Sequence, residues 1–187
     1  MRRSLQMLLL TLVSLFITQL NANAQGPLDP VKLGTWTINI GIGSGAHYFG
    51  NGLGIGPAEK ISCETGMWDV GPGVITLGGE FTCSSFWHHF GDGWKESWTN
   101  FFVAARSAYH YGWDVDGLDT YGGIPVGIGF CAHTLGSQPG NHGYTPVYPY
   151  FGFFVGASYF FTKTIGINGE LGYNSTQANI GVIIKLK

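Results

Sequence analysis

The feature that most constrains the fold of this chain is a strict alternation near its carboxyl terminus. If this segment is a strand, one face carries Ala178, Ile180, Val182, Ile184 and Leu186. The other face then carries Asn179, Gly181, Ile183, Lys185 and Lys187. A period of two is typical of a strand whose faces meet different surroundings. A water-soluble barrel turns the apolar face inward and a membrane barrel turns it toward lipid, so the interior face decides the class of protein.

The same alternation recurs in earlier segments that are separated by clusters of Gly, Pro, Asp and Asn. With the closing segment, the expected strands lie at 35–43, 58–66, 74–83, 98–111, 119–132, 150–161 and 165–173. Pro125 counts against a central position for its strand, because proline cannot donate to the ladder. Eight strands of about ten residues suit a closed antiparallel barrel. The expected fold class is therefore all-β, an eight-stranded antiparallel up-and-down transmembrane β-barrel.

The connections between these segments alternate in length. The long ones are 44–56, 84–97 and 133–149, and they follow the first, third and fifth segments. Short turns follow the second, fourth and sixth, while the short connection around Ser175 is an exception to the long set. Long loops on one rim and short turns on the other are typical of outer-membrane barrels, whose termini lie on the periplasmic rim.

Ionisable residues gather on the faces opposite the apolar ones. They are Lys60, Glu64, Glu80, Arg106, His110, Glu170 and Lys185. An outward apolar face leaves a narrow polar lumen, in which small residues make room for a few long charged ones. Aromatic residues near the segment ends fit interfacial girdles. The apolar side is therefore predicted to face lipid, and a soluble secreted ligand-binding barrel of the lipocalin kind is the alternative.

The amino terminus has the layout of a secretory signal peptide. Arg2 and Arg3 precede an apolar run from Met7 to Ile17, and Ala22-Asn23-Ala24 forms a small-x-small cleavage pattern. The apolar run is shorter than the ~20 residues that a membrane span needs. We expect residues 1–24 to be a signal peptide cleaved after Ala24, 25–33 a periplasmic N-terminal segment, and 34–187 the outer-membrane β-barrel.

Composition excludes one class of partner and favours a membrane surface. Charged residues make up 11% of the chain, against roughly 25% in an average soluble domain. Without Arg2 and Arg3, the nine Lys and Arg become seven against eleven Asp and Glu. The balance is not basic enough for a nucleic-acid partner.

Several stretches resemble a known family. They are "GTWTINIGIG" at 34–43, "FFVAARSAYHYGW" at 101–113, and "IGINGELGYN" and "NIGVIIKLK" at the end. These are similar to the small outer-membrane barrels grouped with OmpX and the OmpA transmembrane domain. Two departures are Ser158, where many relatives have Arg, and Lys187, where an aromatic residue is common.

The resemblance implies a place in the outer membrane of a Gram-negative-type bacterium. It implies contact with outer-membrane lipid and lipopolysaccharide, a monomer, and no cofactor. The implied role is structural or surface-interacting, with an unknown extracellular partner reached through loops 44–56, 84–97 and 133–149.

The predicted site is an interior charge network formed by Glu64, Glu80, Arg106, His110, Glu170 and Lys185. Arg106 is the only arginine left after cleavage, and Glu80 and Glu170 are expected at a similar height in the lumen. A guanidinium can bond two carboxylates at once, and a buried charge is costly unless it is paired. The network is therefore predicted to be a structural plug, and not a selectivity filter or a catalytic pair.

Residues in the long connections offer two further kinds of site. The histidines there are His47, His88, His89, His133 and His142, and their spacing matches no closed metal-ligand set. Ser84 and Ser85 with His88 and His89 form the cluster most comparable to the sites of lipid-modifying barrels, but the required base and acid cannot be assembled around them. The expectation is a non-enzymatic protein, with an outer-membrane lipid-modifying enzyme as the alternative.

The cysteines are odd in number. Cys63, Cys83 and Cys131 allow at most one intramolecular pair. Because Cys83 and Cys131 are expected near the same rim, they are the candidate pair if one forms, provided that their Cα atoms approach within ~7 Å.

Overall fold

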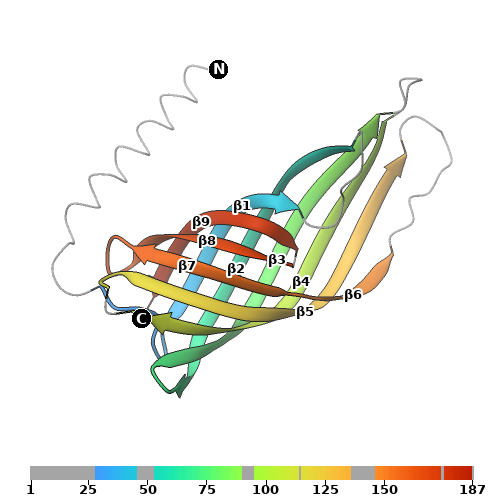
Figure 1. The fold of residues 1–187 in the computed structure, drawn as a ribbon. Coiled ribbons are helices and arrows are strands. Elements are labelled where there is room, and N and C mark those ends of the chain that lie inside the picture. Colours follow the sequence, from blue (N-terminus) through green and yellow to red (C-terminus); the bar gives the residue numbers. More distant parts are fainter. Residues whose placement is uncertain are drawn as a thin grey trace, which may run out of the picture.

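The computed structural model describes residues 28–45, 53–89, 95–113, 115–135, 146–173 and 175–186. Its strands are β1 (Trp36–Gly45), β2 (Leu53–Val70), β3 (Gly73–His89), β4 (Lys95–Gly112), β5 (Leu118–Leu135), β6 (Val147–Phe151), β7 (Phe153–Phe160), β8 (Ile165–Tyr173) and β9 (Thr176–Leu186). All pairs are antiparallel, and β1 pairs with both β2 and β9, so the sheet closes on itself (Figure 1). No helix within the described ranges is long and apolar enough to cross a membrane.

Strands β6 and β7 together occupy one position in the barrel. Both pair with β5, and Gly152 alone separates them. The Gly152 N–H donates to the Pro125 carbonyl at 3.1 Å, but Pro125 has no N–H to return, so the ladder is interrupted at this point. Pro125 thus lies inside a central strand and breaks its neighbour. Counted by position, the predicted eight-stranded up-and-down barrel is confirmed.

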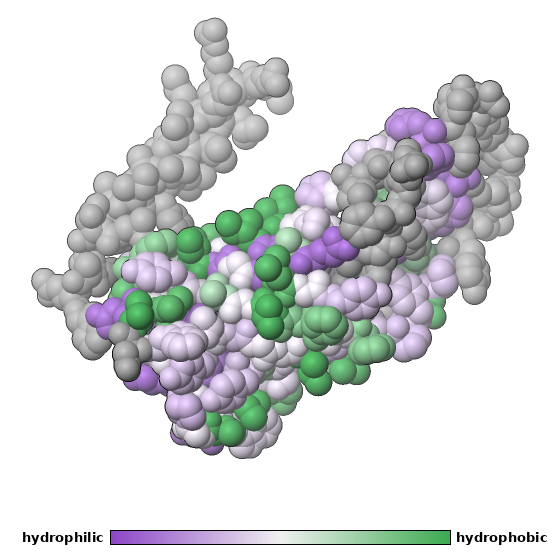
Figure 2. Space-filling view, viewed as in Figure 1, coloured by the Kyte–Doolittle hydropathy of each residue, from purple (hydrophilic) through white to green (hydrophobic). Residues whose placement is uncertain are grey.

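Side chains alternate between the outer wall and the interior. On β1, Ile40 is 53% exposed, whereas Thr37 and Asn39 are 5% and 7% exposed. On β9, Ile180 is 64% exposed and Asn179 is 6% exposed. Apolar side chains accordingly occur along the outer wall (Figure 2). The apolar face of the strands is the outer face, as predicted, and the polar face lines the lumen.

The two ends of the barrel differ. Strands β2 to β5 have 17 or 18 residues, whereas β7, β8 and β9 have 8 to 11. The long strands rise at the end away from the start of β1 and the finish of β9, which is named the loop end (Figure 1). The opposite end, where β1 begins and β9 finishes, is named the terminal end.

The long connections are shorter than the predicted 44–56, 84–97 and 133–149. β3 continues to His89, β4 begins at Lys95, β5 continues to Leu135, and β6 begins at Val147. Polar and aromatic side chains occur on both faces there, so the apolar alternation that identified strands is lost. The ladder continues regardless, with Trp87 opposite Ser97 and Phe86 opposite Trp98.

Two irregularities lie in the raised part of the sheet. In β2 the register shifts between Ile55 and Ala58, because Gly56 and Pro57 together stand opposite one residue of β3. This arrangement is a β-bulge. In β6, Pro149 stands opposite Ile128 of β5.

Residues 28–35, named the N-terminal strap, pack across the terminal end. At one end of the strap, the Leu28 carbonyl accepts a hydrogen bond from the Gly117 N–H at 3.0 Å. Near the other end, the Gly34 N–H donates one to the Gly66 carbonyl at 2.9 Å. Between these anchors Val31 is buried, and Lys185 of β9 donates to a strap carbonyl. Gly66 lies in β2, Gly117 lies between β4 and β5, and Lys185 lies in β9, which is separated from β2 by β1 alone. The strap therefore contacts the sheet at three separate strand ends.

Candidate functional site

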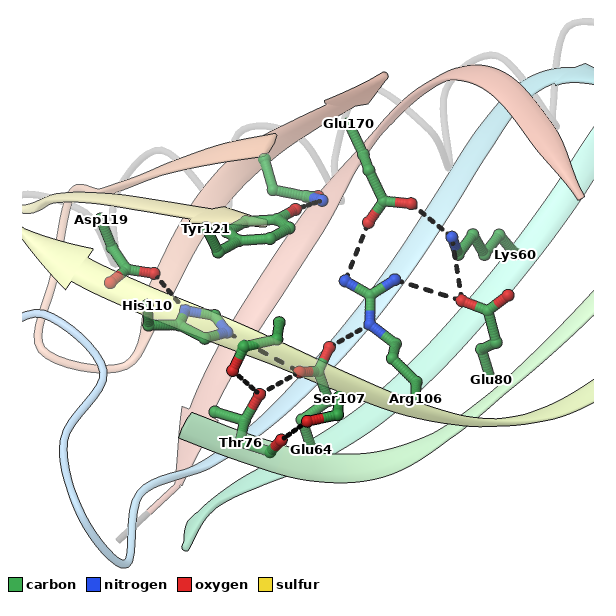
Figure 3. Close-up of polar contacts among 12 residues, drawn as sticks. Lys60, Glu64, Thr76, Glu80, Arg106, Ser107, His110, Asp119, Tyr121 and Glu170 are labelled. Atoms are coloured by element: carbon green, nitrogen blue, oxygen red, sulfur yellow. Dashed lines mark hydrogen bonds and ion pairs between the residues drawn. The ribbon is translucent and has the colours of Figure 1, made fainter. Parts of the chain in front are cut away.

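The lumen holds a buried cluster of charged side chains centred on Arg106 of β4. Arg106 is 2% exposed. Its Nη1 lies 3.2 Å from Oε2 of Glu80 on β3, and its Nη2 lies 2.9 Å from Oε2 of Glu170 on β8. Its Nε donates to the carboxylate of Glu64 on β2. One guanidinium thus joins three carboxylates from three other strands (Figure 3).

A second cation completes the cluster. The Lys60 ammonium of β2 lies 3.1 Å from Oε2 of Glu80 and also contacts the Glu170 carboxylate. Arg106, Glu80, Lys60 and Glu170 therefore form a closed ring of alternating charge (Figure 3). The ring of Phe154 lies 3.7 Å from the Arg106 Cζ, which is cation–π range. Pairing of this kind offsets the several kcal/mol that each buried ion costs in desolvation.

Strand register explains how Arg106 reaches Glu64. Glu64 stands opposite Gly78, and Gly78 stands opposite Arg106, so the three residues form one row across β2, β3 and β4. A Cβ at Gly78 would lie 1.9 Å from the Cys63 carbonyl oxygen. The row therefore requires glycine at position 78, and the side chains of Glu64 and Arg106 meet across it.

A second group lies between the cluster and the terminal end. His110 Nδ1 lies 2.7 Å from Oδ2 of Asp119, and its Nε2 lies 3.7 Å from Oε2 of Glu64. The Thr76 hydroxyl donates to the same Glu64 carboxylate. Tyr121 stacks on the His110 ring at 4.9 Å between centroids. Glu64 therefore links the two groups, and the ionisable residues of both are buried.

The structure brings five of the six predicted residues together. Lys185 is the exception, because it lies at the terminal end, where its ammonium bonds the Asp29 carbonyl and lies 4.1 Å from the Phe160 ring centroid. Lys60 and Asp119 belong to the buried groups although the prediction did not select them. Strand parity was the available signal, since both share the inward face with their neighbours.

The cluster of Ser84, Ser85, His88 and His89 does not form a catalytic set. Alternation along β3 turns Ser84 inward and Ser85 outward, and the Ser85 hydroxyl lies 3.3 Å from that of Thr99. Ser84 and His88 share a face but are separated by about 13 Å at the usual strand rise. A histidine at that distance cannot act directly as the base for the serine.

The remaining candidates at the loop end are histidines. His133 stacks on Trp98 at 5.0 Å, with its Nε2 3.7 Å from Glu96. Within the described ranges no group of three or more His, Cys, Asp or Glu could hold a metal ion. His47 and His142 lie outside the described residues.

All three cysteines are free thiols. Cys83 stands opposite Phe101 on the outer face, while Cys131 stands opposite the buried Asn100 on the inner face. The two side chains point to opposite sides of the sheet, so the candidate pair does not form.

A closed eight-stranded barrel with an apolar outer wall and a polar, side-chain-filled lumen is the architecture of small outer-membrane barrels. Solved structures that are similar to this chain include the two that follow. Ail, the attachment invasion locus protein of Yersinia pestis in complex with the heparin analogue sucrose octasulfate, is 11% identical with a TM-score of 0.51, over 82% of this chain and 96% of that one. The N-terminal β-barrel domain of Pseudomonas aeruginosa OprF is 12% identical with a TM-score of 0.49, over 82% and 98%. The sequence matches no protein-family model and no curated protein.

Proposed function

We propose that this chain is an integral outer-membrane β-barrel of a Gram-negative-type bacterium, exported with cleavage after Ala24. The observation that carries the proposal is the inverted distribution of its side chains. The outer wall exposes large apolar residues such as Ile124, Phe151 and Leu171 at 57%, 79% and 61%, while Arg106 and Glu170 are buried at 2%. Outer-membrane lipid and lipopolysaccharide are the surroundings that match such a wall.

The soluble alternative is unfavourable on the same observation. A soluble barrel would leave this wall in water, at a cost of roughly 1 kcal/mol for each half-exposed large apolar side chain. It would also hold its charges inside instead of on its surface. Contiguous apolar surface of this extent is uncommon on soluble monomers.

Heat-modifiable gel migration after refolding in detergent, with carbonate-resistant association with outer-membrane vesicles, tests the membrane proposal. An inserted barrel should migrate faster unheated than heated and should stay in the pellet. A chain that is extracted by carbonate and migrates identically with and without heating would contradict the proposal.

We infer that the charge cluster plugs the lumen and has a structural role. Its cations and carboxylates contact one another, Phe154 covers the guanidinium, and an eight-stranded barrel has room inside only for side chains. Vesicles containing the protein should therefore show no flux of small sugars above that of empty vesicles. Rapid swelling in an isotonic sugar solution would contradict the plug.

Unchanged lipid A in deletion cells would fit a non-enzymatic protein, and a lipid A species that disappears would contradict it.

The loop end is proposed to serve a surface interaction. Residues 44–56, 84–97 and 133–149 contain one lysine or arginine, Lys95, and two acidic residues, Asp92 and Glu96. A sulfated sugar of the kind bound in the Ail structure needs several cations. The expected partner is therefore not a polyanion, and it is engaged through aromatic and histidine side chains. Cells displaying this protein should pass over immobilised heparin at neutral pH, with Ail-displaying cells as the control, and retention would contradict this assignment.

A further inference from the structure

A pocket opens at the terminal end, away from the lumen cluster. It lies between the N-terminal strap, the turn joining β7 to β8, and the end of β9, and its volume is about 510 Å³. The residues that matter in its lining are Asp29, Lys32, Thr35, Lys163, Lys185 and Leu186. Nothing in the proposed plug uses these side chains.

The pocket is positively charged in a chain that is acidic as a whole. Three lysines line it against one carboxylate, that of Asp29. Asp29 Oδ1 pairs with the Lys32 ammonium at 2.8 Å, while Lys185 bonds the uncharged Asp29 carbonyl. The lining therefore carries an excess of two positive charges, and an anionic group is the ligand that suits it.

The neighbouring outer wall is apolar. Leu186 stands opposite Trp36 in the β1–β9 register, and the two side chains are 43% and 49% exposed. Leu33 in the strap and Phe161 beside the β7–β8 turn are also exposed. A ligand with its charge in the pocket would therefore find apolar surface directly beside it, where acyl chains could lie. Tryptophan at this level is typical of the membrane interface.

We propose that this pocket binds the phosphate of an anionic phospholipid in the periplasmic leaflet. The inference rests on the proposed membrane location. Basic pockets at a membrane surface recognise anionic headgroups, and the apolar wall explains a lipid better than a soluble anion. A zwitterionic headgroup would bring its own ammonium toward the lysines, so phosphatidylglycerol should be preferred over phosphatidylcholine.

The test uses the mature barrel refolded into vesicles made of equal parts phosphatidylcholine and phosphatidylglycerol. Native mass spectrometry of the protein released in mild detergent gives the ratio of the two lipids that stay bound. The variant Lys32→Gln/Lys163→Gln removes two pocket lysines and leaves Lys185 on the strap. Each lysine near an anionic headgroup is worth roughly fivefold in affinity, so the double variant should lose phosphatidylglycerol preference by about 25-fold. Lys95→Gln at the loop end is the matched control and should retain it.

Three results would overturn the site. They are a wild-type barrel with no preference for phosphatidylglycerol, an equal loss in Lys95→Gln, and displacement of the lipid by an equal concentration of inorganic phosphate, which would assign a soluble anion. Heat-modifiable migration is recorded for each sample. A barrel that inserts without lipid preference contradicts only this site, whereas a wild-type chain that does not insert contradicts the proposed function as well.

Discussion

Replacing Arg106 by alanine is the sharpest test of the lumen cluster. The substitution leaves Glu64, Glu80 and Glu170 buried with Lys60 as the remaining strong cation. Lys60 contacts Glu80 and Glu170, so Glu64 loses its principal counter-charge and keeps the Thr76 hydroxyl and the more distant His110. The carboxylates must then take up protons or admit water.

The size of the effect follows from two opposing terms. A charge pair at about 3 Å is worth roughly 5 kcal/mol at an effective dielectric constant of 20. Desolvation of the guanidinium, several kcal/mol, is recovered when Arg106 is removed. The net loss expected for breaking a buried ion pair is about 3–5 kcal/mol. With a urea dependence of about 2 kcal/mol per molar, the unfolding midpoint should fall by roughly 2 M.

The measurement is urea unfolding of barrels refolded in detergent micelles, followed by heat-modifiable migration. Lys163→Ala in the exposed β7–β8 turn is the control and should stay within about 0.5 kcal/mol of wild type. The variant Arg106→Met/Glu64→Gln/Glu170→Gln removes the unpaired charges and keeps the 3.1 Å pair of Lys60 and Glu80. It should be milder than Arg106→Ala. An unchanged midpoint for Arg106→Ala would refute the reasoning, as would a triple variant at least as unstable.

Other expected outcomes concern packing, topology and thiols. Gly78→Ala places a Cβ against the β2 backbone and should lower the free energy of unfolding in urea by about 1–3 kcal/mol. Gly169→Ala, with nothing within 4 Å of the new Cβ, should leave it unchanged. Equal unfolding midpoints for the two variants would contradict the Glu64–Gly78–Arg106 row. In a cysteine-free background, His89→Cys at the loop end should react with an impermeant maleimide on intact cells, and Val115→Cys at the terminal end should not. Labelling of Val115→Cys alone would invert the topology. Thiol titration of the unfolded, non-reduced wild-type chain should give three free thiols, and a value of one would reveal a disulfide.

Strand positions and the inside–outside assignment could be predicted from the sequence because an apolar outer wall and a polar lumen impose a period of two. The strand ends could not, since a ladder beyond the apolar band of the outer wall has no need of apolar alternation. At the terminal end, the second strand was predicted to finish at residue 66, two residues after Glu64. It continues to Val70, and the register puts Glu64 level with Arg106.

The composition of the cluster was predictable only in part. Parity identified Lys60 as facing the lumen and could have identified Asp119, but strand tilt and stagger decide which of the inward residues meet. Lys185 shows the remaining difficulty. Its backbone has the inward parity, yet its flexible side chain reaches the strap, a contact that depends on the path of residues 28–35 and leaves no pattern in the sequence.

The raised sheet at the loop end has consequences for how the protein avoids self-association. Along β6, Pro146 and Gly152 bond to β5, so alternation directs the main-chain groups of residues 147, 149 and 151 to the opposite, outer edge. Pro149 therefore removes a donor from the edge at which another strand could add. On the other side of the raised sheet, the bulge at Gly56 and Pro57 distorts β2 at its last pairing with β1, where Pro57 stands opposite Ser44. Both edges are thus poor templates for an additional strand, which protects the chain from edge-to-edge aggregation and leaves side chains, and not backbone, as the means of contact at this end.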